Sequence, residues 1–149
     1  MQTAGPALPF VEAGSEPLEL RYPFCVVALP NQDFLVATAK EDDEFDASPS
    51  ILHCTPGFKV KRKIMHHGDF ELGYVSGVQC DADTVFAGAD GRTSSFKASD
   101  LSPLRRSDVY NCNLAISSNN VYASTRDNQI VVLDKASLVE RSKSARTLV

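Results

Sequence analysis

The chain has 149 residues, of which 43% are hydrophobic and 23% charged, a balance typical of a folded globular domain and unlike that of a disordered chain. Its formal net charge of −4 disfavours a dedicated nucleic-acid binder, because such proteins usually carry an excess of basic residues. Residues 1–50 hold nine acids and two bases, whereas residues 51–149 hold ten acids and thirteen bases. The acidic run Glu41–Asp46 is expected to be a solvated loop.

Residues 1–16 are expected to form a flexible N-terminal segment, without the basic and apolar regions of a secretory signal. No stretch approaches the 18 consecutive apolar residues that indicate a membrane span. Cys25, Cys54, Cys80 and Cys112 form no CxxC motif, and three of them stand in strand-like apolar runs. They are therefore interpreted as small buried hydrophobes in a reducing compartment, cytoplasmic or nuclear.

Three segments of the chain, 27–38, 78–89 and 114–125, align without gaps at offsets of 51 and 36 residues. Each consists of an apolar strand, four turn-forming residues and a second apolar strand, the pattern of a tight antiparallel hairpin. The small residues Ala37, Gly88 and Ser124 occupy one equivalent position, which suits a place where strands approach closely.

A third and a more polar fourth strand are expected in each unit, the third at 50–54, 92–96 and 129–133 and the fourth at 58–64, 101–106 and 138–143. Pro103 is compatible with a strand only at a sheet edge, because proline cannot donate to the ladder. Pro17–Arg21 resembles the last strand of a preceding unit. No long window has the 3.6-residue apolar period of an amphipathic helix.

Four-stranded meanders repeated at about 40 residues are the signature of propeller blades. We therefore predict an all-β chain in which residues 17–149 form about three antiparallel four-stranded blades, at about 22–65, 74–108 and 109–146. Three blades do not close a ring of the usual four to eight and would leave sheet edges exposed. The ring could be completed by another polypeptide or by self-association, for instance as a dimer with six blades. Alternatively, the units could close as a small sandwich or barrel.

The stretch STRDNQIVVLD, residues 124–134, resembles the closing half of a WD repeat. Leu133-Asp134 stands where that repeat commonly has Trp-Asp, and Phe96-Lys97 stands there in a more degraded second copy. The first unit keeps only the hairpin, and the Gly-His pair that often opens a WD repeat is missing, so that family's hydrogen-bond network is not carried over. The resemblance implies a WD40-like β-propeller, with quinoprotein-like propellers as an alternative.

Chemical sites have weaker support in the sequence. His66, His67 and Asp69 could be metal ligands, but adjacent side chains on a strand diverge, and an exposed connector is the favoured interpretation. Glu41–Asp46 lacks the spacing of a calcium loop, and His53 and Cys54 diverge in the same way as the two histidines. We therefore expect no catalytic, cofactor-binding or metal site.

Basic residues cluster on or after the fourth strands, at 59–63, 105–106 and 141–146. Charge on an outer strand prevents edge-to-edge pairing, and this is the favoured explanation. Contact with an acidic protein surface or with RNA phosphates is the alternative.

Propeller blades act as rigid platforms that present loops to partners. The sequence therefore predicts a non-catalytic protein–protein interaction scaffold, working as a homo-oligomer or as a subunit of a larger complex, without a membrane. A small-molecule- or sugar-binding propeller, catalytic or not, is the first alternative, and an RNA-associated scaffold is the second. The candidate partner-binding residues lie in the hairpin turns and the acidic loop: Asn31, Asp33, Asp42, Asp43, Glu44, Asp81, Asp83, Asn119, Asn120 and Arg126.

Overall fold

A computed structural model describes residues 10–17, 23–38, 51–89, 92–110 and 113–145. Every regular element in these ranges is a β-strand, which confirms the all-β prediction. Within the same ranges there is no helix with the length and hydropathy needed to cross a membrane.

The first sheet has the strand order β1-β5-β4-β3-β2. Its elements are β1 (Phe10–Pro17), β2 (Pro23–Ala28), β3 (Phe34–Thr38), β4 (Ile51–Cys54) and β5 (Lys59–Ile64). The last four form the expected meander, whereas β1 is a strand that the sequence analysis did not predict. β1 lies antiparallel to β5, and Pro17 pairs with Lys59 at the outer edge of this sheet. Residues 18–21 of the strand expected at Pro17–Arg21 lie outside the described ranges.

The second and third sheets are four-stranded antiparallel meanders, ordered β11-β10-β9-β8 and β12-β13-β14-β15. Pro103 opens the edge strand β11, as expected. A short hairpin of β6 (His66–His67) and β7 (Phe70–Glu71) connects the first sheet to the second. The remaining strands are β8 (Val75–Cys80), β9 (Thr84–Ala89), β10 (Arg92–Lys97), β11 (Pro103–Tyr110), β12 (Asn113–Ile116), β13 (Asn120–Ser124), β14 (Ile130–Asp134) and β15 (Glu140–Lys143).

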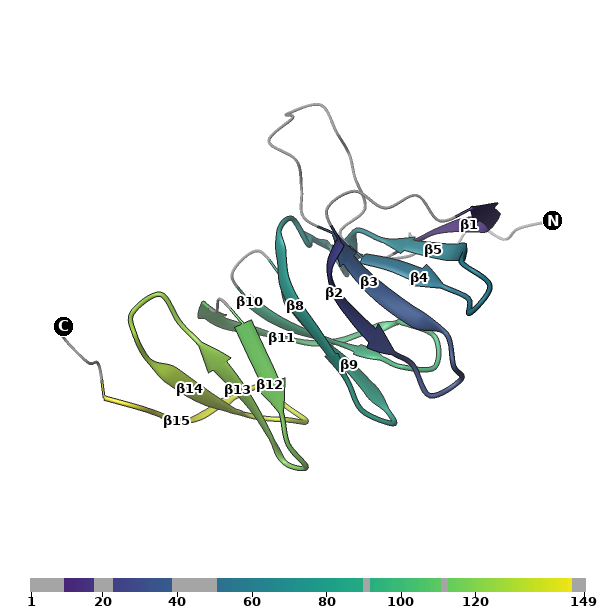
Figure 1. Cartoon of the computed structure of the whole chain (residues 1–149). Helices are drawn as coiled ribbons and strands as arrows, with labels where there is room; N and C mark the ends of the chain where they lie inside the picture. Colours follow the sequence, from purple (N-terminus) through teal and green to yellow (C-terminus); the bar gives the residue numbers. More distant parts are fainter. Residues whose placement is uncertain (1–9, 18–22, 39–50, 90–91, 111–112, 146–149) are drawn as a thin grey trace.

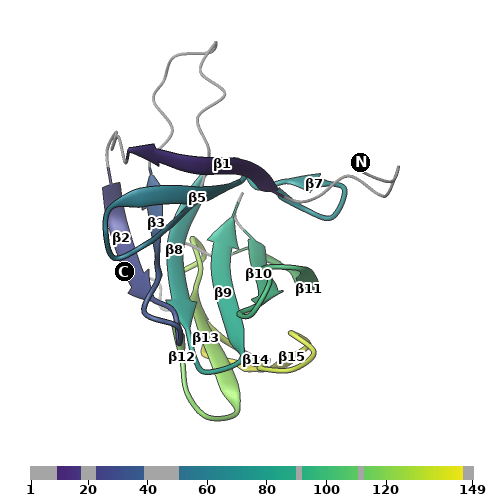
Figure 2. The same cartoon turned by 90° about the vertical axis from the view of Figure 1, so that its right-hand side faces the viewer.

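The three sheets follow one another like consecutive propeller blades, and we call them the first, second and third blade (Figure 1). The first strand of the second blade, β8, contacts the first strands of both neighbours, β2 and β12. The view turned by 90° shows β1 and β5 at one end of the molecule and the β12–β13 hairpin at the other (Figure 2).

The register of the second and third hairpins agrees with the gapless alignment, because Cys80 pairs with Val85 and Ile116 with Val121. The first hairpin differs, since Ala28 pairs with Phe34 and the turn therefore holds five residues, 29–33. The expectation of a four-residue turn is wrong here. The extra residue is accommodated by Gln32, whose φ of 73° lies in the left-handed region.

The core lies between the blades. Alternate residues of β9 face opposite neighbours: Val85 and Ala87 pack with Leu35 of the first blade, whereas Phe86 packs with Val121 and other residues of the third. Both faces of the second blade are therefore covered. Because the hydrophobic effect scales with apolar area removed from water, this packing between sheets is the main stabilising interaction.

The turn between the third and fourth strands of every blade contains one residue with φ near +60°: Phe58, Leu101 and Leu138. Only glycine adopts this conformation without a steric penalty, which costs other residues about 1 kcal/mol. Leu101 and Leu138 are 1% and 3% exposed and belong to the core, whereas Phe58 is 65% exposed. Burial of the two leucine side chains therefore offsets the backbone strain at their positions. The exposed Phe58 side chain gives no comparable gain.

This difference predicts that a glycine substitution at the equivalent turn position affects the stability of the protein strongly in the third blade and weakly in the first. Leu138→Gly should lower the free energy of unfolding by about 2–4 kcal/mol, because a buried leucine is lost. Phe58→Gly relieves strain and removes a largely exposed ring whose aromatic contact is edge-on to Phe34, with centroids 6.1 Å apart, so it should change the free energy of unfolding by less than about 1 kcal/mol. Urea denaturation of both variants measures this, and equal losses would contradict the assignment of Leu138 to the core.

Candidate functional site

The turns between the first and second strands of the three blades, residues 29–33, 81–84 and 117–120, lie at the same end of the fold (Figure 1). We call this end the turn face. It contains six of the ten candidate partner-binding residues. Each turn joins two paired strands of its blade, so the blades fix the position of the turn face.

The first turn is held by its own polar groups. The Leu29 amide donates to the Asp33 carbonyl at 2.7 Å, and the Gln32 amide donates to the Leu29 carbonyl at 3.1 Å. The Asn31 side chain accepts from the Asp33 amide at 3.1 Å and donates to the Asp33 carboxylate at 3.2 Å. These bonds fix the backbone of a turn whose tip, including Asn31, is exposed.

Asp33 lies inside the fold instead of at its surface. Only 7% of it is exposed, and its Oδ2 atom accepts from His53 Nε2 at 2.8 Å and from Lys61 Nζ at 3.1 Å. His53 comes from β4 and Lys61 from β5, so one carboxylate joins the turn to the third and fourth strands. Asp33 therefore stabilises the turn face without forming its outer surface.

Charge balance in this cluster explains its pKa shifts. Burial by itself would raise the pKa of Asp33, but the hydrogen bonds from His53 and Lys61 outweigh it, and the pKa is lowered. For His53, burial lowers the pKa against the opposing effect of Asp33. Because a carboxylate only accepts, Nε2 carries the His53 proton, and Nδ1 makes no hydrogen bond within the described residues.

The second and third turns are joined to each other by Lys135. Its Nζ forms an ion pair with Asp81, and its amide donates to the Asn119 carbonyl at 3.0 Å. Asp81 also accepts from the amides of Asp83 and Thr84 at 2.9 and 2.8 Å. Burial would raise the pKa of Asp81, but these partners lower it. Asp81 is thus a structural cap, and the two turns are held in a fixed relative position.

The third turn is closed by Ser117, whose amide donates to the Asn120 carbonyl at 2.9 Å. Asn120 is half-buried and donates through Nδ2 to the Tyr122 hydroxyl at 3.4 Å. Asn119 is exposed, as are Asn31 and Asp83. Among the candidate residues, the turn face therefore presents two amides and one carboxylate to solvent, one from each blade.

The other candidates lie elsewhere. Asp42, Asp43 and Glu44 fall outside the described residues. Arg126 lies in the turn between β13 and β14, at the end of the blades opposite to the turn face. The structure thus brings together Asn31, Asp33, Asp81, Asp83, Asn119 and Asn120 and separates Arg126 from them.

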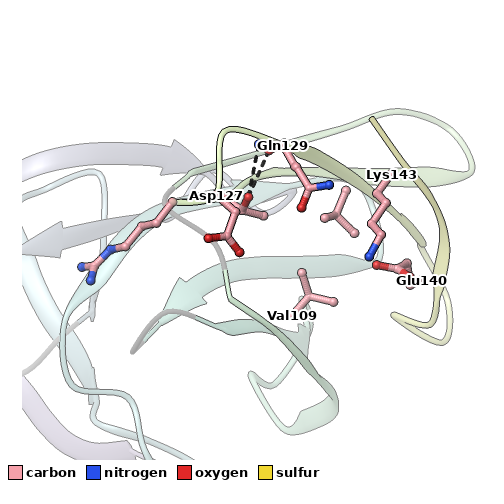
Figure 3. Close-up of a pocket in the computed structure, with 8 residues that line it drawn as sticks. Val109, Asp127, Gln129, Glu140 and Lys143 are labelled. Carbon is pink, nitrogen blue, oxygen red and sulfur yellow. Dashed lines mark hydrogen bonds between the residues drawn. The ribbon is translucent and has the colours of Figure 1, made fainter. Parts of the chain in front are cut away.

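Arg126 belongs to an open cleft of about 350 Å³ between the second and third blades (Figure 3). Val109 of β11 forms one wall, and the opposite wall comes from the third blade. Its charged residues include two acids and two bases. The lining residues are Val109, Thr125, Arg126, Asp127, Gln129, Val131, Glu140 and Lys143.

The two adjacent histidines point in opposite directions, as expected for a strand. His66 is exposed, but the expectation of an exposed connector is wrong for His67, which is 7% exposed. His67 Nε2 lies 2.9 Å from the Ser95 carbonyl, and its ring packs edge-on against Phe96 with centroids 5.0 Å apart. Arg106 lies over the ring of Phe70, 3.7 Å from its centroid, so the connector hairpin is docked on the second blade.

Cys54 and His53, for which no catalytic role is expected, lie in different environments. Burial raises the pKa of Cys54 to about 11, and Asp33 adds to this rise, so the thiolate that a nucleophile requires is disfavoured near neutral pH. His53 points to Asp33, away from Cys54, which packs in a separate apolar cluster. Among the described residues no group of three or more His, Cys, Asp or Glu side chains could hold a metal ion.

Several basic residues of the fourth strands have partners inside the fold. Lys61 binds Asp33, Arg62 donates to the Asp100 carbonyl at 3.2 Å, and Arg141 forms an ion pair with Asp134. No pattern in the sequence indicates these partners, nor the roles of His53 and Lys135 at the turn face, because residues far apart in the chain meet only when strands and blades pack.

The sequence has no significant match among protein-family models or among curated proteins.

Removing the charge of Asp33 should weaken the fold. Asp33→Asn leaves His53 and Lys61 facing a neutral amide, and we expect the free energy of unfolding to fall by about 2–4 kcal/mol. The matched control is Asp83→Asn in the neighbouring turn, where an exposed side chain should matter by less than about 0.5 kcal/mol. Urea denaturation measures both, and similar losses would refute the structural role of Asp33.

Acidification should weaken the docking of the connector hairpin. Burial lowers the pKa of His67, against the effect of the Ser95 carbonyl. The unfolded chain then binds more protons below about pH 6.5, so this contribution to stability is complete above that pH and is lost as the pH falls. His67→Gln, whose amide can still donate to Ser95, should therefore show a smaller loss of stability between pH 7 and pH 5 than the unmodified protein or His66→Gln. Identical pH dependence of all three would contradict this.

Proposed function

We propose that this protein is a non-catalytic scaffold for protein–protein interactions, built of WD40-like propeller blades and acting in the cytoplasm or nucleus as part of an assembly. The observation that carries the proposal is the turn face, where three turns from three blades lie at one end and are held by internal hydrogen bonds and ion pairs. A surface that is rigid before binding loses little conformational entropy when a partner docks.

The chemistry of the turn face supports a polar protein partner. Asn31 and Asn119 each offer an amide that can both donate and accept, and Asp83 offers a carboxylate. Backbone amides and basic side chains of another protein would satisfy these groups. Resemblance to the WD repeat supports the same class of function, because Leu133 and Phe96 take the place of its usual Trp and are both almost fully buried.

The cleft between the second and third blades favours small-molecule binding as a second candidate. Side chains of both charge signs line it, which would suit a zwitterionic ligand. Its wide opening argues against this, because small-molecule sites usually enclose most of the ligand surface. The RNA-associated alternative is weaker, since Lys61, Arg62 and Arg141 are engaged within the protein.

Photo-cross-linking in cells tests the proposal. A photoreactive amino acid is placed singly at Asn31, Asp83 or Asn119, with exposed Asp69 in the β6–β7 hairpin as the matched control. We expect the three turn positions to cross-link to the same protein and Asp69 to give no such product, because only the turn face would contact the partner. Cross-linking to RNA alone, to no macromolecule, or equally from Asp69 would refute the proposal.

A further inference from the structure

The two faces of each blade have different neighbours. We call the face toward the following blade the front face and the other the back face. Cross-strand pairs place Leu35 opposite His53, Phe86 opposite Ser95 and Tyr122 opposite Val132. In each blade the residue just before Leu35, Phe86 or Tyr122 lies on the back face. Because side chains alternate along a strand, Leu35, Phe86 and Tyr122 therefore occupy equivalent positions on the three front faces.

Exposure differs sharply among these equivalent positions. Leu35 and Phe86 are both 0% exposed, because the next blade covers them. Tyr122 is 38% exposed and Ile130, in the neighbouring row, is 46% exposed. The front face of the third blade thus corresponds in position to the covered front faces of the first and second blades, but within the described residues no sheet covers it.

The opposite end of the series is closed. On the back face of the first blade, Val36, Leu52, Cys54 and Val60 form a buried apolar cluster, with Phe34 packed against it. Among the large hydrophobic side chains whose exposure the structure describes, only Val26 and Phe58, at 67% and 65%, are strongly exposed at this end of the molecule. A head-to-tail contact would need this back face to be open, so it is disfavoured.

We call the uncovered front face of the third blade the open face. Its composition permits contact with an identical surface. One row across the sheet holds Ala115, Tyr122, Val132 and Ser142, and the next holds Ser124 and Ile130. None of these residues is charged. The acid at the margin, Asp134, is paired with Arg141, so two copies can approach without like-charge repulsion.

We propose that the front face of the third blade packs on the same face of a second copy of this chain, giving a two-fold symmetric dimer. This inference deepens the assembly part of the proposed function and depends on it. Apolar sheet faces pack about 10 Å apart when they are covered, and two-fold contacts are the commonest in soluble oligomers. Tyr122 lies in the central row, where a large aromatic side chain contributes most to binding.

The test is the absolute mass in solution, measured by light scattering and sedimentation up to about 100 μM, well above micromolar dissociation constants. We expect a mass close to twice the 16.2 kDa of one chain. Ile130→Glu and Tyr122→Glu should each weaken dimerisation by at least about 100-fold, because a charge would be buried without a partner. Both side chains are partly exposed in the single chain, so the fold should persist, as circular dichroism would show.

Leu104→Glu is the matched control, because Leu104 is as exposed as Ile130, at 46%, but lies on β11. It should leave the dimer intact. A monomer at every concentration, open-ended oligomers, or a dimer that neither Glu variant affects would overturn the inference. A monomer that still cross-links a partner through Asn31, Asp83 and Asn119 would refute the dimer while leaving the scaffold proposal standing.

Discussion

The rest of the structure depends on one constraint: the second blade is apolar on both faces and must be covered on both sides. In the second blade this is satisfied by Val85 and Ala87 on one side and Phe86 on the other. A sheet with two apolar faces has no stable existence as a single layer in water. Stacking of blades is therefore part of folding, and the position of every turn follows from it.

Packing between the blades outweighs local backbone strain. Leu101 and Leu138 adopt a left-handed conformation that glycine would accept more readily, because their side chains complete the core between blades. The polar groups follow the same logic. The carboxylates of Asp33 and Asp81 are paired with His53, Lys61 and Lys135, and these pairs hold the backbone of the turns in place.

The two ends of the blade series have different chemistry. A cluster of buried apolar residues closes the back face of the first blade, whereas the front face of the third blade exposes Tyr122 and Ile130. Exposed apolar patches on a sheet mark interaction sites or aggregation hazards. The turn face is polar, whereas the front face of the third blade is uncharged and partly apolar, and the two surfaces adjoin where Asn120 donates to the Tyr122 hydroxyl.

The amino-acid sequence was sufficient to predict the four strands of each unit, their grouping into three units and most turn positions, because alternating apolar residues and turn-forming residues are local properties of the chain. It also placed Pro103 at an edge and separated His66 from His67. It could not reveal the extra residue at Gln32, the pairing of β1 with β5, or the burial of His67 against Ser95. The contacts of Asp33 with His53 and Lys61, and of Asp81 with Lys135, form only when the strands and blades pack. These contacts join strands and blades whose distance in space is set by core packing, and local sequence carries no record of that distance.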